Sequence, residues 1–161
     1  MFTRIDHVGI AVPDLDAAIA FYAETFGLRA VHQEVNEDQG VREAMLQVGS
    51  GPDGTMVQLL APLRPDSPIG KFLDRSGPGV QQVADTVEDV EAACATLRAR
   101  GLRVLYDRAR GGTGGSLVNF VHPKDAGGVL IELVQPPAGA AAGGPGCAVG
   151  HGGLPIDVTD G

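Results

Sequence analysis

Two stretches of the chain share one pattern and place candidate metal-binding side chains at matching positions. Residues 5–18 (IDHVGIAVPDLDAA) align without gaps with residues 80–93 (VQQVADTVEDVEAA) at an offset of 75 positions. In this alignment His7 corresponds to Gln82. Imidazole nitrogens bind many divalent ions, and an amide oxygen suits the harder ones. The repeat therefore puts one candidate ligand at the same place in each copy.

The ends of the two copies match as well. Residues 57–62 (VQLLAP) align with residues 131–136 (IELVQP) at an offset of 74, so Gln58 corresponds to Glu132. Each of these polar residues stands in an otherwise apolar strand, where a buried polar group without a partner is costly. We expect the candidates from both copies to converge on one metal site, formed by His7, Gln58, Gln82 and Glu132.

Each copy has the hydrophobic spacing of a strand, a helix and three further strands. In the first copy we expect strands at 5–12, 29–36, 41–49 and 56–60 and a helix at 16–26. In the second we expect strands at 80–87, 104–107, 117–122 and 129–134 and a helix at 90–100. Asp14 or Asp16 can cap the first helix and Gly27 can end it, while Ser67 followed by Pro68 predicts a short connecting helix.

The fold class predicted by this pattern is α+β, with two βαβββ modules whose strands curl around a concave face. The predicted modules are residues 1–62 and 80–136, joined by a linker at 63–79. Ligand positions on the first and last strand of each module would meet in the mouth of such a sheet. Residues 137–161 are rich in Ala, Gly and Pro and predict a disordered tail, because they offer little apolar surface to bury.

Composition excludes several classes of protein. The formal net charge of −8 argues against a nucleic-acid partner, although local basic residues can still hold a small anion. The chain has no run of 18 apolar residues, and its start does not resemble a secretory signal, so we expect a soluble cytoplasmic protein with no membrane partner. Cys94 and Cys147 are expected to be reduced, and Cys147 with His151 in the tail is better explained as part of an unstructured segment than as a metal site.

The duplicated βαβββ pattern over residues 1–136 resembles the vicinal oxygen chelate superfamily, also described as glyoxalase- or bleomycin-resistance-like. Within it, several strings resemble the methylmalonyl-CoA epimerase family. They are IDHVGIAVPDLDAAIAFY, EVNEDQGVREAML, DSPIGKFL and LYDRARGGTGGSLVNFVHPKDAGGVLIELV. The resemblance implies an isomerase that interconverts (2R)- and (2S)-methylmalonyl-CoA at a divalent metal centre.

That family's ligands are His, Gln, His and Glu, and by resemblance they fall on His7, Gln58, Gln82 and Glu132. The chain departs from the pattern at Gln82, where the family typically has the second His of a pair. A set of one nitrogen and three oxygen donors favours one hard or borderline ion, Mn²⁺, Mg²⁺ or Co²⁺, over Zn²⁺. Asp85 stands where the family more often has an aromatic residue.

The implied chemistry is removal of a proton from the carbon next to a thioester. A metal bound to the thioester oxygen would stabilise the enolate as a Lewis acid. Inversion of that carbon needs an acid–base group on each of its faces. The resemblance places these groups on Glu43, within GVREAML, and on Glu132, which would also be a metal ligand.

The acyl-CoA partner brings phosphates that need cationic or backbone donors. Candidate contacts with CoA lie before and after the strand at 117–122, and they are Arg110, Gly112, Ser116 and Lys124. His122, at the end of that strand, is a candidate contact with the acyl group. A flexible hairpin loop explains the glycines equally well, and His122 could merely close the turn before Pro123. We also expect a homodimer.

Other functions remain open at this point. The chain could be an epimerase of another 2-substituted malonyl-CoA such as ethylmalonyl-CoA, because one methylene group discriminates by only ~1–3 kcal/mol. It could also be a metal-free binding protein of the same fold. An extradiol dioxygenase needs two His and one carboxylate around iron, and Gln82 removes one His. Nothing in the sequence favours a glyoxalase-type isomerase.

Overall fold

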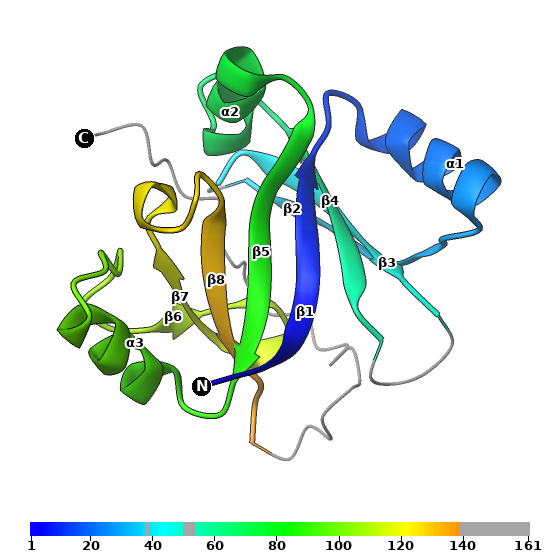
Figure 1. Cartoon of the computed structure of the whole chain (residues 1–161). Helices are drawn as coiled ribbons and strands as arrows, with labels where there is room; N and C mark the ends of the chain where they lie inside the picture. The colour runs from blue at the N-terminus through cyan, green and yellow to red at the C-terminus, as the bar shows by residue number, and fades with distance from the viewer. Residues whose placement is uncertain (38, 50–53, 139–161) are drawn as a thin grey trace. The chain divides into compact units, whose positions relative to one another are not determined.

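The structure is a computed structural model that describes residues 1–37, 39–49 and 54–138. The order strand, helix and three strands occurs twice along the chain (Figure 1). The first set is β1 (Phe2–Ala11), α1 (Leu15–Phe26), β2 (Ala30–Asn36), β3 (Val41–Gln47) and β4 (Met56–Pro62). The connecting helix α2 (Pro68–Ser76) precedes β5 (Gly79–Val87), α3 (Val90–Ala99), β6 (Arg110–Gly111), β7 (Leu117–Val121) and β8 (Leu130–Gln135). The predicted βαβββ repeat is therefore confirmed.

The chain forms two compact units, and each contains part of β1 and part of β5. The described part of the first consists of residues 7–37, 39–49 and 54–81, and we call it the His7 unit. The described part of the second consists of residues 1–6 and 82–138, and we call it the Glu132 unit. Each unit is described below by itself.

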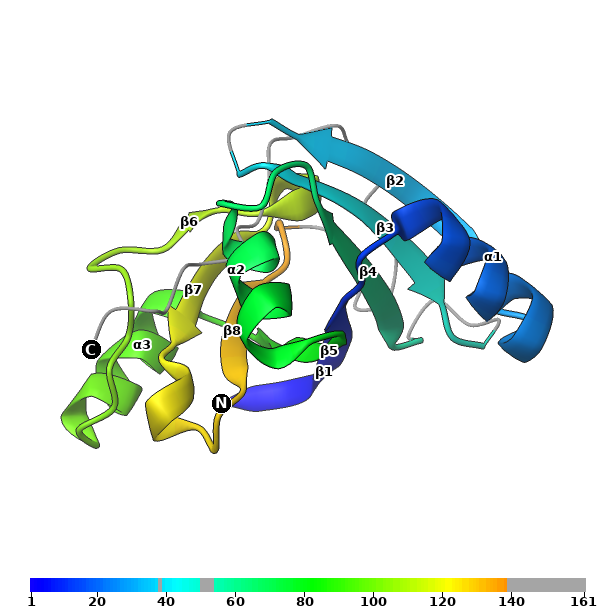
Figure 2. The ribbon, with the colours of Figure 1, turned by 90° about the horizontal axis from the view of Figure 1, so that it is seen from above.

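In the His7 unit the strands lie in the order β2-β3-β4-β1. β2, β3 and β4 pair antiparallel, whereas β1 runs parallel to β4. Helix α1 covers one face of β3 and β4 (Figure 2), with Leu15 packed against Leu46 and Leu59 in an apolar cluster. The helix therefore occupies one face, and the other face carries the polar residues described in the next section.

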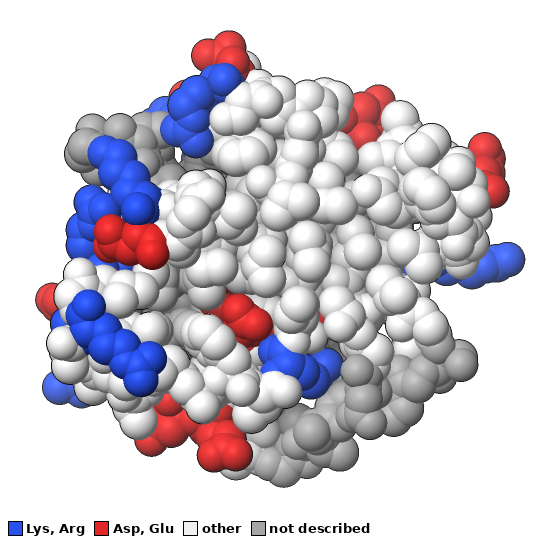
Figure 3. Space-filling model, viewed as in Figure 1, with Lys and Arg blue, Asp and Glu red and all other residues white. Residues whose placement is uncertain are grey.

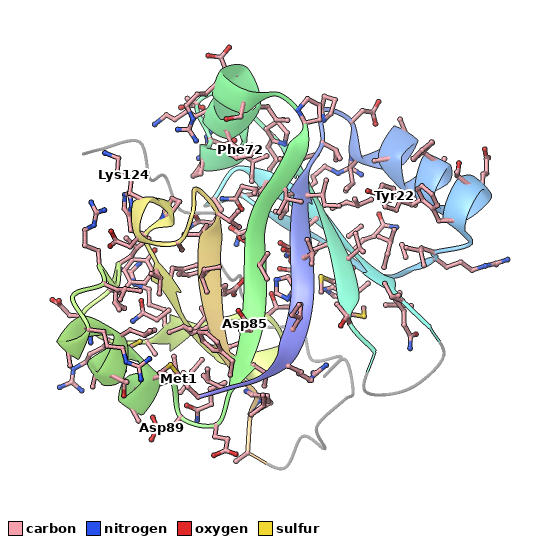
Figure 4. All side chains as sticks on the ribbon, viewed as in Figure 1. Met1, Tyr22, Phe72, Asp85, Asp89 and Lys124 are labelled. Carbon is pink, nitrogen blue, oxygen red and sulfur yellow. The ribbon has the colours of Figure 1, made fainter. Side chains whose placement is uncertain are left out.

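Helix α1 ends where the sequence predicts and begins one residue earlier, at Leu15. Asp14 is the N-cap, and its side chain accepts a hydrogen bond from the backbone N–H of Ala17 at 3.0 Å. Gly27 is the C-cap with φ of 70°, a left-handed conformation that glycine adopts without steric cost. Tyr22 packs against the same apolar cluster from the side of α1 (Figure 4). The acidic cap thus fixes where the chain turns from β1 into the helix.

The predicted connecting helix is confirmed as α2. Ser67 caps it by accepting from the N–H of Gly70 at 3.1 Å, and Pro68 occupies the first turn. Ile69 is fully buried against Leu60, and Phe72 packs on the same cluster (Figure 4). This contact packs α2 against the end of β4.

In the Glu132 unit the strands lie in the order β5-β8-β7-β6, with β5 parallel to β8 and the other pairs antiparallel. Helix α3 packs against β7 and β8 through Cys94 and Leu97, which meet Val121 and Leu133. Cys94 is a buried free thiol whose pKa is raised, chiefly by burial. The thiol is therefore part of the packing under the sheet.

The prediction of a strand at 104–107 is wrong. Val104 makes only an isolated bridge to Val121, and the second strand of this module is β6, three residues further along the chain. The backbone of Tyr106 pairs instead with the side chain of Asn119, which donates to its C=O and accepts from its N–H. A side chain thus replaces the strand partner that the hydrophobic pattern suggested.

The surface charge differs between the two helices that cover the sheets. Space-filling atoms over α1 are mostly uncharged, whereas Lys, Arg, Asp and Glu gather around α3 (Figure 3).

Among the described residues, no helix is long and apolar enough to cross a membrane. Residues 139–161, with Cys147 and His151, lie outside the described part of the chain.

Candidate functional site

Strand register places three of the predicted site residues on one face of the His7 unit. Gln58 on β4 lies beside Gly9 of β1, and His7 is two residues before Gly9 on that strand. Gln58 also lies directly opposite Met45 of β3, two residues after Glu43. Residues two apart on a strand point to the same side, and paired residues share a face. His7, Gln58 and Glu43 therefore lie on one face, opposite the face covered by α1.

These three side chains are polar groups held inside the protein. Glu43 is only 1% exposed, and His7 and Gln58 are buried as well. The amide Nε2 of Gln58 donates a hydrogen bond to Oε2 of Glu43 at 3.1 Å. This bond turns the amide nitrogen of Gln58 toward the carboxylate of Glu43, so the amide oxygen of Gln58 faces away from that carboxylate.

The Glu132 unit carries a second amide–carboxylate pair. Gln82 on β5 pairs with Leu130 of β8, so Glu132, two residues further on, shares its face. Nε2 of Gln82 donates to Oε2 of Glu132 at 3.0 Å, and both residues are buried. Within each unit the predicted ligands therefore share a face, while their convergence on one site stays a prediction.

The donor set fits a divalent ion only if the amides contribute. The described residues contain no group of three or more His, Cys, Asp or Glu side chains able to hold a metal. The predicted set has just two of those types, His7 and Glu132, so Gln58 and Gln82 must supply the rest. Both amides are turned with nitrogen toward a carboxylate, an orientation that suits them as oxygen donors. The donor types of this set are therefore those that a hard or borderline ion takes, and their convergence on one site stays a prediction.

The predicted substrate contact Arg110 stacks on an aromatic ring. Its guanidinium lies 3.5 Å from the ring centroid of Tyr106, and that ring meets Phe120 edge-on at 6.2 Å between centroids. Phe120 is the cross-strand partner of Glu132, so the stack is built on the same face as that carboxylate. Arg110 is exposed, which leaves its cationic group accessible to an anion.

Gly112 and Ser116 close the loop after β6. The N–H of Gly112 donates to the C=O of Ser116 at 2.8 Å, and the Ser116 hydroxyl donates to the C=O of Thr113 at 2.8 Å. A Cβ at Gly112 would lie 2.6 Å from Ser116 Oγ and from a methyl of Val118, so no larger residue fits without a shift. Close packing therefore explains Gly112, and its role toward a substrate stays a prediction.

His122 and Lys124 lie in the turn between β7 and β8. Nδ1 of His122 accepts from the N–H of Lys124 at 3.1 Å, and Lys124 extends from the turn as an exposed cation (Figure 4). Arg103 bonds Asp125 in the same turn at 2.7 Å and lowers the pKa of that carboxyl well below its usual range. The structure thus gives His122 a role in closing the turn, and its contact with an acyl group stays a prediction.

Two structural features escaped the sequence reasoning. The first is Asn119, fully buried, whose side chain bonds both backbone groups of Tyr106. The second is a hydrogen bond of 3.0 Å between Nε2 of His32 and Oε2 of Glu34 on β2. The spacing His32-x-Glu34 was the available signal for the second feature, because residues two apart on a strand share a face.

Asp85, which differs from the residue type usual in the resembled family, lies midway along β5 (Figure 4). Burial raises the pKa of its carboxyl. The neighbouring Thr86 donates to Asp6, which also pairs with Arg4 at 3.1 Å. We have no physical account of the acidic residue at position 85.

The comparisons with known proteins identify the fold and the family of this chain. The Glyoxalase/Bleomycin resistance protein/Dioxygenase superfamily matches residues 6–120. A methylmalonyl-CoA epimerase structure from Mycobacterium tuberculosis is 55% identical with a TM-score of 0.77, covering 84% of this chain and 89% of that one. A methylmalonyl-CoA epimerase in complex with methylmalonyl-CoA and NH4+ is 50% identical with a TM-score of 0.80, covering 90% and 100%.

Another relative is named for two substrates. The ethylmalonyl-CoA/methylmalonyl-CoA epimerase of Cereibacter sphaeroides is 39% identical over 137 residues, which are 84% of this chain and 99% of that protein. Identity at this level over nearly whole chains shows common descent as well as a common fold. The chain therefore belongs to the methylmalonyl-CoA epimerase family.

Proposed function

We propose that this protein interconverts (2R)- and (2S)-methylmalonyl-CoA by moving a proton at C2. The observation that carries the proposal is Glu43, a carboxylate that is 1% exposed and aligned by the amide of Gln58 at 3.1 Å. A buried carboxylate held in one orientation is suited to take a proton from carbon, a role worth ~10²–10⁴ in rate. The family relationship adds the substrate class.

Glu132 is the proposed acid–base group for the other face of C2. Inversion requires that one carboxylate removes the proton while the other delivers one from the opposite side. Glu132 is held by Gln82 as Glu43 is held by Gln58, so both carboxylates are oriented before substrate arrives. Fixed orientation reduces the rearrangement needed to reach the transition state.

A divalent ion is the proposed cofactor, held by His7, Gln58, Gln82 and Glu132. When bound, it would polarise the thioester carbonyl and stabilise negative charge on that oxygen. The three oxygen donors in this set favour Mn²⁺, Mg²⁺ or Co²⁺. Arg110 and Lys124 are the proposed contacts for the anionic parts of CoA, because both are exposed cations.

Ethylmalonyl-CoA is the second candidate substrate. The observation that favours it is the relative from Cereibacter sphaeroides, whose name includes both acyl groups. One added methylene changes binding by only ~1–3 kcal/mol, so one site can accept both acyl chains.

We also propose that the protein is cytoplasmic and forms a homodimer.

Deuterium uptake at C2 in D₂O tests the proposal. The substrates are methylmalonyl-CoA and ethylmalonyl-CoA, with propionyl-CoA as the control that lacks the free carboxylate. We expect rapid uptake with the malonyl thioesters, loss with a chelator, and recovery with added Co²⁺ or Mn²⁺. Uptake that is equally fast with propionyl-CoA, or absent with every thioester, contradicts the proposed function.

A matched pair of variants tests the role of Glu43. Glu43→Gln removes the base but keeps the size of the side chain, so uptake should fall by ~10²–10⁴. Glu37→Gln is the control, because Glu37 is an exposed residue of the same unit after β2. Equal rates in the two variants would remove Glu43 from the mechanism.

A further inference from the structure

A second acid–base pair lies on the same face as Glu43. On β2, Nε2 of His32 and Oε2 of Glu34 are 3.0 Å apart. The side chains are 30% and 21% exposed, so both are partly buried and both reach solvent. The two residues are two positions apart on the strand and therefore project to one side of the sheet.

Strand register connects this pair to Glu43. Glu34 of β2 lies directly opposite Glu43 of β3. Side chains directly opposite in an antiparallel pair share a face, with Cβ atoms about 4.5–5.5 Å apart. Two carboxyl groups at this spacing are within reach of a direct hydrogen bond or of one bridging water. The path from Glu43 to Glu34 therefore stays within the His7 unit.

The arrangement is unfavourable unless a proton or a cation reduces the repulsion. Like charges directly opposite on neighbouring strands destabilise a sheet. Arg42, adjacent to Glu43, projects to the other face, where its guanidinium bonds Asp16 at 3.1 Å. His32 is therefore the group on this face that contacts Glu34 and can carry positive charge.

Turnover creates a need for proton exchange at Glu43. In the proposed reaction, Glu43 gains a proton from C2 while the opposite carboxylate delivers one. Before the next turnover in the same direction, Glu43 must lose its proton. Glu43 is 1% exposed and has little direct contact with water, whereas the His32–Glu34 pair is partly exposed.

We propose that His32 and Glu34 form the proton path between Glu43 and solvent. The proton of the Glu43 carboxyl moves to the Glu34 carboxylate, and the proton on Glu34 moves to Nε2 of neutral His32. His32 then releases a proton to water while Glu132 regains one from solvent, so the enzyme returns to its starting protonation state and no electrons are transferred. Glu34 and His32 are positioning residues that act through Glu43, and this inference rests on the proposed epimerase function.

Steady-state kinetics of Glu34→Gln and His32→Gln with methylmalonyl-CoA test the path. Resetting the free enzyme limits kcat but not kcat/KM, so we expect kcat to fall about tenfold while kcat/KM changes less than about twofold. Added imidazole should restore kcat, because a small base can carry the proton in place of the missing group. Val35→Thr is the matched control, since Val35 is an exposed residue of β2 that points to the opposite face.

Two results overturn the path. One is an unchanged kcat in both variants, and the other is an equal loss of kcat and kcat/KM that imidazole does not restore, which indicates a structural role. The wild-type protein measured with the same imidazole concentrations excludes a general effect of the base. Wild-type protein that does not turn over methylmalonyl-CoA would reject the proposed function and this path with it.

Discussion

Gln82 on β5 donates a hydrogen bond from Nε2 to Oε2 of Glu132 on β8 over 3.0 Å, and both side chains are buried. The His7 unit contains a similar bond from Gln58 to Glu43 over 3.1 Å. The two bonds are built from different positions of the repeat, because Gln82 corresponds to His7 and Glu132 corresponds to Gln58. Each unit therefore positions one carboxylate with one amide, although the underlying sequence repeat does not require it.

Replacing Gln82 should change which metal ions the protein prefers. Gln82→His exchanges an oxygen donor for a nitrogen donor, so affinity for Co²⁺, Ni²⁺ and Zn²⁺ should rise relative to Mg²⁺. Gln82→Ala should weaken every ion by at least about tenfold, a loss typical even for an outer partner of a metal site. Isothermal titration of the variants with Co²⁺ and Mg²⁺ measures both effects.

Gln81→Ala is the control for this titration. Gln81 is the same residue type one position earlier on β5, and it projects to the other side of the strand. Its variant should bind metal as the wild type does. Wild-type affinity in Gln82→Ala would show that Gln82 does not bind the ion.

Replacing Gln81 with a leucine should stabilise the fold. Gln81 is 5% exposed, and its Oε1 is a buried acceptor that has no hydrogen-bond partner among the described residues. An apolar side chain of similar size removes that desolvation cost, so we expect a gain of about 1 kcal/mol in the free energy of unfolding. The shift of the urea midpoint measures this gain in stability, provided that the m-value is unchanged. Gln82→Leu is the control and should destabilise the fold, because it breaks the bond to Glu132. A lower urea midpoint for Gln81→Leu than for the wild type would contradict the prediction.

Stability should decrease as pH falls through about 6.5, the usual pKa of His. Burial and, to a smaller extent, Arg103 lower the pKa of His122, and its Nδ1 accepts a hydrogen bond, so the folded protein prefers the neutral ring. Between the lowered pKa of the folded state and about 6.5 the unfolded chain binds more protons, so acid favours unfolding. The urea midpoint measured from pH 8 to pH 5.5 follows this effect.

His122→Asn is the test variant for that pH dependence. Asn can accept the same backbone hydrogen bond but does not titrate. Its urea midpoint should therefore depend less on pH over this range than that of the wild type. An equal slope in both proteins would assign the effect to another group.

Asn119→Ala should destabilise the Glu132 unit by about 1–3 kcal/mol, because the backbone N–H of Tyr106 loses its Asn119 acceptor and the C=O of Tyr106 keeps only the bond from Arg98. Thermal unfolding measures the loss. Asn36→Ala is the control, since Asn36 is half-buried and accepts one hydrogen bond, from the N–H of Gln39. It should cost less, and equal losses would contradict the special role of Asn119.

The sequence by itself determined the repeated order of strands and helices. Period-two and helical spacings of apolar residues are local signals, and so are the caps at Asp14 and Ser67, which the structure confirms. The match between residues 5–18 and 80–93 predicted the duplication, because equal folds keep equal apolar positions. The same spacing failed at 104–107, where the chain forms an isolated bridge from Val104 to Val121 instead of a strand.

The tertiary structure decided which side chains face one another. The sequence does not state that Glu34 lies opposite Glu43, because the pairing depends on the register of β2 against β3 and on the irregularity near Ala30. It also does not state that Asn119 reaches the backbone of Tyr106, thirteen residues away in the chain. Strand register and side-chain contacts arise from packing between segments distant in sequence, and a shift of one residue would turn each side chain to the other face.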